Sequence, residues 1–396
     1  MNKKIDIFCK IVDNFGDIGV CWRLSQQLAN EHRRQVRLFI DDFYIASKII
    51  PQFDLSRKNQ TINNVSITAW PTEKVTMSDA KLPDVVIENF SCGLPESYVQ
   101  QILAQQKSAH PVRLINLEYL SAEKWVEDCH ALPSIHPTLG LKKTFFYPGF
   151  TEKTGGLLRE QSLIETRDAF LASPAQQQQF WQQFVSLSKM RGPVLQNFPE
   201  AIKISLFGYP QANIGQLIRQ LIPTEKTVHI FLPFNSEITA LNTLIEKYHL
   251  KVGEAKALHR VRLHLLPFLS QTQYDQLLWA CDLNFVRGED SWIRAIWAGK
   301  PFVWQPYIQA ENTHLTKLTA FLSQYTREAD ADTKNLIETA HLVWSNAQAL
   351  DHEKFWLELK KCLPEWQQYA LEKSTLLAQQ TSLSQALVNF CDQSNA

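Results

Sequence analysis

Hydrophobic runs and amphipathic segments alternate along the first third of the chain. Val20, Leu24 and Leu28 recur every four positions, which predicts one face of a helix over Val20–Ala29. Pro95–Gln105 predicts a second helix, with a proline at its start where the missing N–H costs nothing. Short apolar runs typical of buried strands occur at Ile5–Cys9, Gln35–Ile40, Val65–Trp70, Val85–Asn89 and Val112–Leu117. Strands separated by helical crossovers predict a mostly parallel sheet that is covered on both faces.

A second alternating series follows a change of composition in the middle of the chain. Asp168–Lys189 is rich in glutamine, but its aromatic residues at helical spacing favour a docked amphipathic helix. Arg191–Glu200 contains two prolines and a glycine and is interpreted as a linker. The next predicted strands are Ile202–Phe207, Val228–Leu232, Val261–Leu266, Leu283–Val286 and Pro301–Trp304. The helices between them are Ile214–Leu221, Ser236–Tyr248, Thr272–Ala280 and Ser291–Ala298, and Gly299 gives the last a clear stop.

Two such series predict an α/β protein with two doubly wound domains that face each other across a cleft. We expect the first domain to span residues 1–195, with the C-terminal helix 377–396 packing back on it. The second domain is expected to span residues 200–376. A chain of 396 residues agrees with this division, because domains commonly contain about 100–200 residues.

Composition and charge narrow the functional classes. Hydrophobic residues make up 45% of the chain, which excludes a disordered protein. Lys plus Arg and Asp plus Glu are 40 each, so we expect no nucleic acid and no membrane as a partner, although a local basic groove stays possible. The seven cysteines form no CxxC pair, and the start of the chain has no signal-peptide pattern, so a cytoplasmic protein is expected. The histidines show no metal-site spacing.

The first candidate site is the loop Asp13–Gly19 (DNFGDIG), which joins the first strand to the first helix. In open α/β sheets, ligands bind at this carboxyl end of the strands. The spacing differs from a dinucleotide fingerprint, and carboxylates here would repel a pyrophosphate but suit a cationic or proton-donating acceptor. By spacing alone a structural role is equally favoured, in which Asp17 caps the helix and Asp13 stabilises a turn.

The second candidate site is Phe285–Ser291 (FVRGEDS), between a strand and a helix of the second half. A helix start suits a phosphate, Arg287 adds a forked cation, and Ser291 adds a hydroxyl at the cap position. Glu289 and Asp290 would suit the hydroxyls of a sugar. The structural alternative is a capped helix with Arg287 in a surface ion pair, but a polar run directly after a buried strand favours function.

Aromatic residues form a third set, because they flank the ends of two strands of the second half: Phe207, Tyr209, Phe268 and Tyr274. Such rings could sandwich a planar base, and Gln271 could hydrogen-bond to its edge. By spacing alone a role in closing the core is favoured for these rings. Two further loops, Leu117–Leu120 and Phe145–Gly149, could face an acceptor, although core packing explains them as well.

Four segments carry a specific resemblance, in order along nearly the whole chain. They are Asp13–Gly19 (DNFGDIG), Phe207–Pro210 (FGYP), Asn284–Ser291 (NFVRGEDS) and Trp297–Tyr307 (WAGKPFVWQPY). Together they resemble the elongation factor P arginine rhamnosyltransferases, the EarP family. The resemblance implies a GT-B glycosyltransferase with two Rossmann-like domains. It implies inverting, metal-independent transfer of rhamnose from dTDP-β-L-rhamnose to one arginine of translation elongation factor P, which then rescues ribosomes stalled at polyproline.

The same resemblance implies roles for residues of this sequence, and it implies no cofactor. Asp17 would be the general base, Asp13 its supporting carboxylate, and Glu289 would act at the sugar or leaving-group side. The acceptor-side loop would include Asn14, Phe15 and Gly16. The donor nucleotide would be held by Phe207, Tyr209, Phe268, Gln271, Tyr274, Arg287, Asp290 and Ser291.

Two other functions stay open from the residues alone. One is a GT-B glycosyltransferase that acts on a small molecule or a lipid, although paired acids favour a cationic acceptor. The other is a non-catalytic nucleotide-sugar-binding protein, which would keep donor binding without transfer. The physical chemistry favours the enzyme, because carboxylates can orient a guanidinium and accept its proton as a C–N bond forms.

Overall fold

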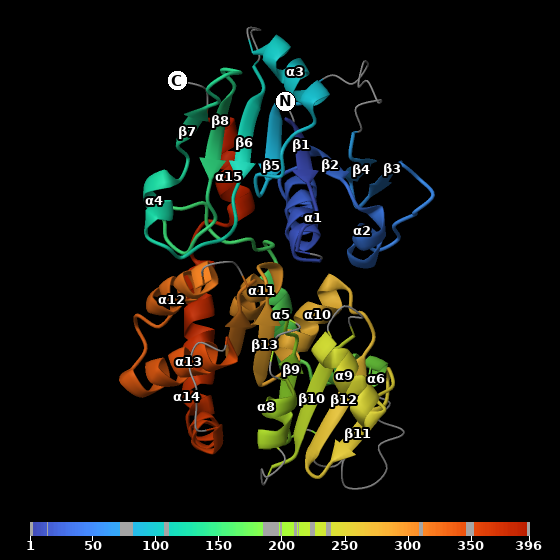
Figure 1. Ribbon diagram of the computed structural model, residues 1–396, viewed down its shortest axis with the longest axis vertical. Helices are drawn as coiled ribbons and strands as arrows, with labels where there is room; N and C mark the ends of the chain where they lie inside the picture. Colours follow the sequence, from blue (N-terminus) through green and yellow to red (C-terminus); the bar gives the residue numbers. More distant parts are fainter. Residues whose placement is uncertain are drawn as a thin grey trace. The chain divides into compact units, whose positions relative to one another are not determined.

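The computed structural model describes residues 3–13, 15–71, 82–106, 111–184, 198, 200–209, 212, 214–221, 226–234, 239–308, 312–345 and 352–393, with the backbone alone for 184, 239–240 and 352–361. Internal contacts divide the chain into two compact units (Figure 1). The first unit is Met1–Gln161 with Ala378–Ala396, and the second is Ser162–Leu377. Each unit contains one twisted sheet with helices against it.

The sheet of the first unit is largely parallel. Its strands are Lys4–Cys9 (β1), Gln35–Ile40 (β2), Asn59–Ile62 (β3), Val65–Ala69 (β4), Val85–Asn89 (β5), Arg113–Leu117 (β6), Pro133–Ile135 (β7) and Lys142–Phe146 (β8). They lie in the order β3-β4-β2-β1-β5-β6-β8-β7. Only the edge strands β3 and β7 pair antiparallel with their neighbours among the described strands. The prediction of a mostly parallel sheet is therefore confirmed for this unit.

Both faces of this sheet are buried, as the continuous apolar runs predict. Its helices are Phe15–Asn30 (α1), Phe43–Ile49 (α2), Glu96–Gln105 (α3), Trp125–Cys129 (α4) and Leu383–Asp392 (α15). Phe8 and Phe39 stack at 4.5 Å between ring centroids, and Tyr98 of α3 packs on both rings. The alternate residues Ile7 and Leu38 are also fully buried, so the opposite face is covered too.

The strand order reverses between β1 and β5. After β1 the chain builds β2 and β4 on one side, and it then returns to place β5 and β6 on the other side. Side-chain groups that follow β1, β5 and β6 therefore meet at the carboxyl edge of the sheet. A crevice at such a reversal is where open α/β sheets bind ligands.

The C-terminal helix α15 belongs to the first unit. It packs against α1, and the Leu383 N–H donates to the carbonyl of Leu157 at 2.9 Å. Gly156 makes this crossing possible, because its φ is 73° and a Cβ there would lie 2.2 Å from the Thr381 oxygen. Any other residue at position 156 would meet both backbone strain and a clash.

The sheet of the second unit repeats the design. Its strands are Ile202–Leu206 (β9), Val228–Pro233 (β10), Ala255–Leu258 (β11), Val261–Leu266 (β12), Leu283–Arg287 (β13) and Phe302–Gln305 (β14). They lie in the order β11-β12-β10-β9-β13-β14, and the edge strand β11 is antiparallel to β12. Here the order reverses between β9 and β13, whose carboxyl ends are neighbours. The two doubly wound halves predicted from the sequence are therefore confirmed.

Nine described helices accompany this second sheet. They are Leu163–Ala172 (α5), Pro174–Phe184 (α6), Ile214–Leu221 (α8), Thr239–Tyr248 (α9), Gln271–Ala280 (α10), Asp290–Ala298 (α11), Thr313–Tyr325 (α12), Ala331–Trp344 (α13) and His352–Ala378 (α14). Gly299 ends α11 with a φ of 62°, as the stop signal predicts. Trp292 of α11 and Trp304 of β14 stack at 3.7 Å between ring centroids in the core.

The boundary between the units falls earlier than the expected division at residues 195–200. Helices α5 and α6 lie in the second unit, although the sequence analysis placed them in the first domain. Phe170 packs on Trp279, and the Arg167 guanidinium donates to the Trp297 carbonyl at 2.9 Å. These contacts to α10 and α11 are long-range and leave no local signal. The predicted linker, residues 191–200, lies outside the described residues except for Phe198 and Glu200.

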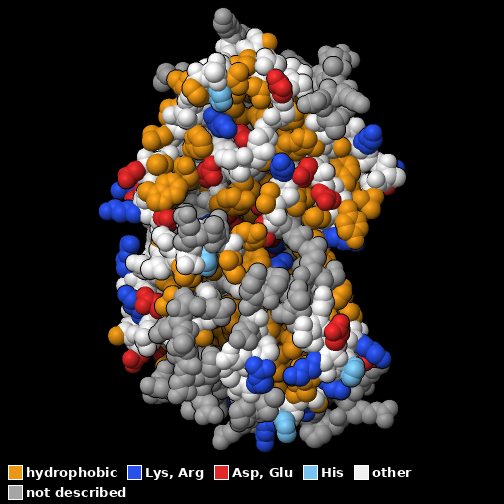
Figure 2. All heavy atoms as spheres, in the orientation of Figure 1, with side chains coloured by type: hydrophobic (Ala, Val, Ile, Leu, Met, Phe, Trp, Pro, Cys, Tyr) orange, Lys and Arg blue, Asp and Glu red, His pale blue; other side chains and the backbone are white. Residues whose placement is uncertain are grey.

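Charged side chains of both signs are distributed over the surface. On the face drawn in Figure 2, basic and acidic side chains are interspersed among hydrophobic ones, in keeping with a net charge of zero. Within the residues that the structure describes, none of the helices combines the length and apolar character needed to cross a bilayer.

Candidate functional site

Asp17 lies in the first turn of α1, and its carboxylate is held by three donors. The Oδ2 atom accepts the backbone N–H groups of Val12 at 2.7 Å and of Asp13 at 2.8 Å. The hydroxyl of Tyr119 donates to Oδ1 at 3.3 Å. A capping aspartate would accept N–H groups inside its helix, whereas the two backbone donors here precede it. Asp17 therefore closes the loop after β1 and does not cap α1.

Burial makes Asp17 more basic than an exposed aspartate. The residue is 2% exposed, and loss of solvent is the main cause that raises its pKa. The two backbone hydrogen bonds oppose this rise, while the charge of Asp13 adds to it. Because the net direction is upward, Asp17 is better suited to accept a proton near neutral pH than an ordinary carboxylate.

Asp13 is brought next to Asp17 by a tight turn. The N–H of Gly16 donates to the Asp13 carbonyl at 2.7 Å. A Cβ at position 16 would lie 3.0 Å from Asp13 Oδ2, so the glycine leaves room for this carboxylate. Phe15 begins α1 and is partly buried. Asn14, the remaining residue of the predicted acceptor-side loop, lies outside the described residues.

In the second unit, Arg287 joins two of the predicted motifs. Its guanidinium carbon lies 4.4 Å from the ring centroid of Phe207 and 4.7 Å from that of Tyr209. The rings follow β9 and Arg287 ends β13, so the reversal of strand order brings them together. The structural alternative, a surface ion pair of Arg287, does not describe this cation–π arrangement.

The turn from β13 into α11 contains three further predicted residues. Helix α11 begins at Asp290, with Glu289 at the N-cap position and Gly288 at a φ of 62°. Ser291 was expected at the cap position, but it is the second residue of the helix. Its hydroxyl accepts the N–H of Arg287 at 3.2 Å and donates to the carbonyl of the same residue. Ser291 therefore fixes the turn that presents Arg287.

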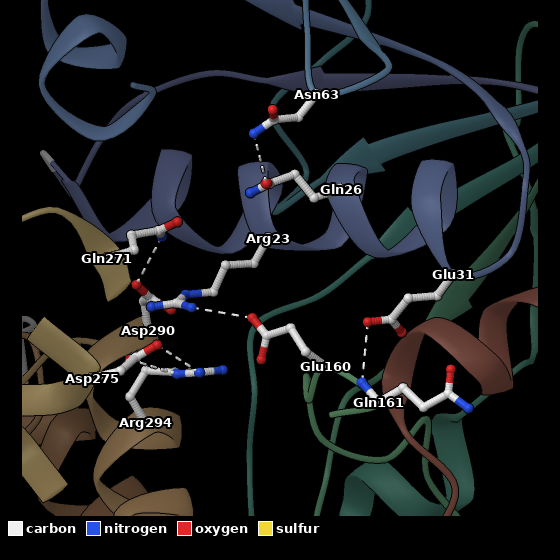
Figure 3. Close-up of polar contacts among 10 residues, drawn as sticks. All are labelled: Arg23, Gln26, Glu31, Asn63, Glu160, Gln161, Gln271, Asp275, Asp290 and Arg294. Atoms are coloured by element: carbon white, nitrogen blue, oxygen red, sulfur yellow. Dashed lines mark hydrogen bonds and ion pairs between the residues drawn. The ribbon is translucent and has the colours of Figure 1, made fainter. Parts of the chain in front are cut away.

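Helix α10 places the remaining predicted donor residues beside this turn. Gln271 Nε2 donates to Asp290 Oδ2 at 3.3 Å, as Figure 3 shows. The ring of Tyr274 lies 5.9 Å from that of Phe207, and burial raises the pKa of Tyr274, so its hydroxyl stays protonated. Phe268, which follows β12, is 38% exposed. The eight predicted donor residues therefore come from the carboxyl ends of β9, β12 and β13 and the starts of α10 and α11.

Sequence reasoning missed the side chains that support this second cluster. Asp275 of α10 and Arg294 of α11 form a buried bidentate ion pair, with N–O distances of 2.9 and 2.7 Å (Figure 3). Gln305 accepts the N–H of Tyr209 at 2.9 Å. The Asp275–Arg294 pair could not be found from the sequence, because opposite charges on two different helices form no local pattern. Gln305 lies within the recognised motif Trp297–Tyr307, so it could have been predicted as a site residue.

Support is also present in the first unit. Arg23 of α1 is nearly buried and pairs with Glu160 at 3.1 Å, and the Gln161 N–H donates to Glu31 at 3.1 Å. Figure 3 shows that one contact starts from Arg23 of α1 and the other from Glu31, directly after α1, and that both reach the segment that ends the first unit. They hold the helix that carries Asp17. In the described part of the chain, no group of three His, Cys, Asp or Glu side chains is arranged to hold a metal ion.

Comparisons with known proteins point to one family. Residues 5–392 match the family model described as elongation factor P (EF-P) rhamnosyltransferase EarP. A protein-arginine rhamnosyltransferase from Pseudomonas putida is 40% identical over 97% of both chains. One from Neisseria meningitidis is 33% identical over 97% of this chain and 96% of its own. A solved structure on EarP-mediated arginine glycosylation of translation elongation factor EF-P is 29% identical, covers 98% of both chains and has a TM-score of 0.64.

Proposed function

The chain belongs to the EarP family of elongation factor P rhamnosyltransferases, and we propose that it transfers L-rhamnose from dTDP-β-L-rhamnose to an arginine of translation elongation factor P. It is a glycosyltransferase of GT-B architecture, and the resemblance seen in its sequence motifs is confirmed. The donor, the acceptor protein and the residue roles rest on this membership and on the two clusters. Such an acceptor would place the reaction in the cytoplasm and link it to ribosomes stalled at polyproline.

Asp17 is the proposed general base. A guanidinium is a poor nucleophile, because its charge is delocalised and its pKa is above ~12. The carboxylates of Asp17 and Asp13 would bind it by charge-assisted hydrogen bonds and localise a lone pair on one nitrogen. As that nitrogen forms a bond to the anomeric carbon, its proton passes to Asp17 and the bond from that carbon to the diphosphate breaks. The buried position of Asp17 and the rise in its pKa support this role.

The second-unit cluster is the proposed donor site. Phe207, Tyr209, Phe268 and Tyr274 would contact the planar base, with Gln271 at its edge. Arg287 and the start of α11 would stabilise the negative charge that develops on the departing diphosphate. Asp290 would accept hydroxyl groups of the donor, and Glu289 would act at the sugar or leaving-group side. We propose that this arrangement needs no metal ion.

Inversion of the anomeric configuration follows if acceptor and leaving group occupy opposite faces of the sugar. A sugar that loses its diphosphate passes through an oxocarbenium-like state, which a nucleophile attacks from the open face. A β-linked donor would then give an α-linked rhamnosyl arginine. The acceptor acids belong to the first unit and the donor cluster belongs to the second, which is consistent with an acceptor and a leaving group on opposite faces of the sugar.

Mass spectrometry of the acceptor tests the proposal. Purified elongation factor P is incubated with the protein and dTDP-β-L-rhamnose, and we expect a gain of one deoxyhexosyl group on one arginine. Replacing that arginine by lysine should abolish the gain, and so should omission of the donor. NMR of the product peptide should show an α-linkage, and excess chelator should leave the rate unchanged.

The alternatives predict different outcomes in the same assay. Deoxyhexose on a lipid or a small molecule, with none on elongation factor P, would favour a GT-B enzyme with another acceptor. Tight binding of the donor without transfer to any of these acceptors would favour a non-catalytic nucleotide-sugar-binding protein. A β-linked product would exclude the inverting mechanism but leave the acceptor assignment in place.

A further inference from the structure

An aromatic pair lies beside Asp17 at the carboxyl edge of the first sheet. Phe90 directly follows β5 and Tyr119 follows β6 by two residues, and these strands pair in parallel with Asn89 opposite Leu117. The two rings stack with centroids 4.0 Å apart and planes 5° from parallel. The loop that contains Tyr119 is one for which the sequence could not separate an acceptor contact from core packing.

Core packing does not explain this pair. Tyr119 is 38% exposed, although its ring is held in a defined stack. Phe90 and Ser91 are both in the left-handed region, with φ of 55° and 51°. A bulky residue rarely takes that conformation, and such strain persists where the surrounding structure imposes it, most often at functional sites.

Polar contacts hold the strained bend in place. The N–H of Phe90 donates to the Leu117 carbonyl at 2.7 Å. The Ser91 hydroxyl is 2.9 Å from Glu118 Oε1, and that same oxygen accepts the side-chain amide of Asn116. The bend thus joins the ends of β5 and β6 and fixes the ring of Phe90 against Tyr119.

The Tyr119 hydroxyl donates to Oδ1 of Asp17, the carboxylate oxygen that is better placed to accept a proton from a substrate. Asp17 Oδ2 is occupied by two backbone N–H groups at 2.7 and 2.8 Å. Its Oδ1 receives the hydroxyl of Tyr119 at 3.3 Å, a longer and weaker contact. A substrate N–H can compete with a weak donor more easily than with two short backbone ones, so Oδ1 is the atom placed to take a proton.

We propose that Tyr119 is a positioning residue for Asp17, and that its ring, held by Phe90, is the surface on which the acceptor guanidinium lies. This inference rests on the proposed function. A planar guanidinium stacks on aromatic faces, whereas the compact, strongly hydrated ammonium of lysine does so less readily. Since the Tyr119 hydroxyl is one hydrogen bond from Asp17, a guanidinium on the face of this ring would be within reach of the base.

Three titratable groups of the described residues face Asp17. Asp13 faces it from the loop after β1, and its charge raises the pKa of Asp17. Cys21 faces it from the next turn of α1 as a buried thiol whose pKa is raised by burial. Tyr119 faces it from the end of β6, and its hydrogen bond lowers the pKa of Asp17. Loss of the hydroxyl should therefore move the acid limb of the pH profile to higher pH.

Three variants separate the two parts of the proposal, with kcat/KM for the acceptor measured from pH 5 to 9. Tyr119→Phe keeps the stack, so we expect near wild-type rates at high pH and about fivefold to tenfold lower rates on the acid limb. Tyr119→Leu should also raise the acceptor KM about tenfold, with the donor KM unchanged. Phe90→Leu should raise the acceptor KM while leaving the acid limb in place.

Tyr98→Phe is the matched control. It also removes a tyrosine–aspartate hydrogen bond in the first unit, because the Tyr98 hydroxyl donates to Asp6 at 2.5 Å. We expect it to lower thermal stability without shifting the acid limb.

Asp17→Asn, assayed in parallel, separates this inference from the proposed function. Suppose that Asp17→Asn abolishes transfer, that Tyr119→Phe has the wild-type pH profile, and that Tyr119→Leu has the wild-type KM for the acceptor. The inference about Tyr119 is then overturned, and Asp17 stands as the general base. If Asp17→Asn keeps the wild-type transfer rate, the assignment of Asp17 as the general base fails, whereas the transfer to elongation factor P stands. A shifted acid limb in Tyr119→Phe alone, with the control unshifted, supports the positioning role.

Discussion

The guanidinium of Arg287 lies over the ring of Phe207, at 4.4 Å from its centroid, although Arg287 ends β13 and Phe207 follows β9. The ring holds the planar cation in one orientation, and Ser291 fixes the backbone of Arg287 from the following helix. A preformed cation needs little reorganisation when negative charge develops on a diphosphate. Substitutions of Arg287 therefore test directly whether this cluster binds the donor nucleotide.

We expect Arg287→Lys to weaken binding of dTDP about tenfold and Arg287→Met about a hundredfold, because lysine keeps the charge but loses the fork and the stacking. Isothermal titration calorimetry measures both effects. Arg219→Lys, at an exposed position near the end of α8, is the control and should bind dTDP like the wild type. Wild-type affinity in Arg287→Lys would contradict a role for the planar guanidinium.

The buried pair of Asp275 and Arg294 predicts a non-additive effect on stability. Arg294→Met removes the cation that compensates the buried charge of Asp275, so the free energy of unfolding should fall by about 3–5 kcal/mol. The double variant Asp275→Leu with Arg294→Met removes both charges and should recover most of that loss. Chemical denaturation of the four proteins in the cycle measures the coupling. Additive losses would show that the pair contributes no specific interaction.

Two buried histidines predict a dependence of stability on pH. His229 and His264 are 2.8 Å apart between ring nitrogens, and burial lowers the pKa of His229 to about 3 and that of His264 well below its usual value. The positive charges of Lys203 and Arg262 act in the same direction. Both rings are thus neutral in the fold, whereas an unfolded chain takes up protons below pH ~6.5.

The unfolded state therefore binds more protons in this range, and the free energy of unfolding should fall as the pH drops below ~6.5, by about 1.4 kcal/mol per pH unit for each histidine. Thermal melts at pH 7, 6 and 5 measure the slope. His264→Phe should make it shallower, because one proton-binding group is gone and an aromatic ring still packs on Phe231. His259→Asn, exposed and in the left-handed region, should keep the wild-type slope. Equal slopes in all three proteins would disprove the assignment.

The sequence predicts the central strands well, because a strand buried on both faces needs a continuous apolar run. Phe8, Phe39 and their neighbours in β1 and β2 are examples. The edge strands Asn59–Ile62 (β3) and Pro133–Ile135 (β7) were not predicted. Most of their side chains are exposed, so these strands do not need the apolar run that marks a buried strand. The sequence motifs identified the residues of both clusters. They could not predict which of these residues touch, because the residues follow strands that are far apart in the sequence.

Site details show the same limit at the level of single residues. Ser291 reads as a helix cap, and only the backbone shows that it closes a turn on Arg287. Tyr119 belongs to no recognised motif. Its proposed role depends on a contact with Asp17, which follows β1, whereas Tyr119 follows β6, two strands away in the sheet. The strain at Phe90 is likewise invisible in the sequence, because nothing in the residue type predicts a positive φ there.

The central claim is that the carboxylate of Asp17 accepts a proton from the acceptor arginine. Single-turnover transfer to elongation factor P with saturating dTDP-β-L-rhamnose tests it most directly, in the wild type and in Asp17→Asn. We predict a loss of about a thousandfold in the transfer rate, with dTDP affinity unchanged within about twofold. A transfer rate in Asp17→Asn within tenfold of the wild type would contradict the account.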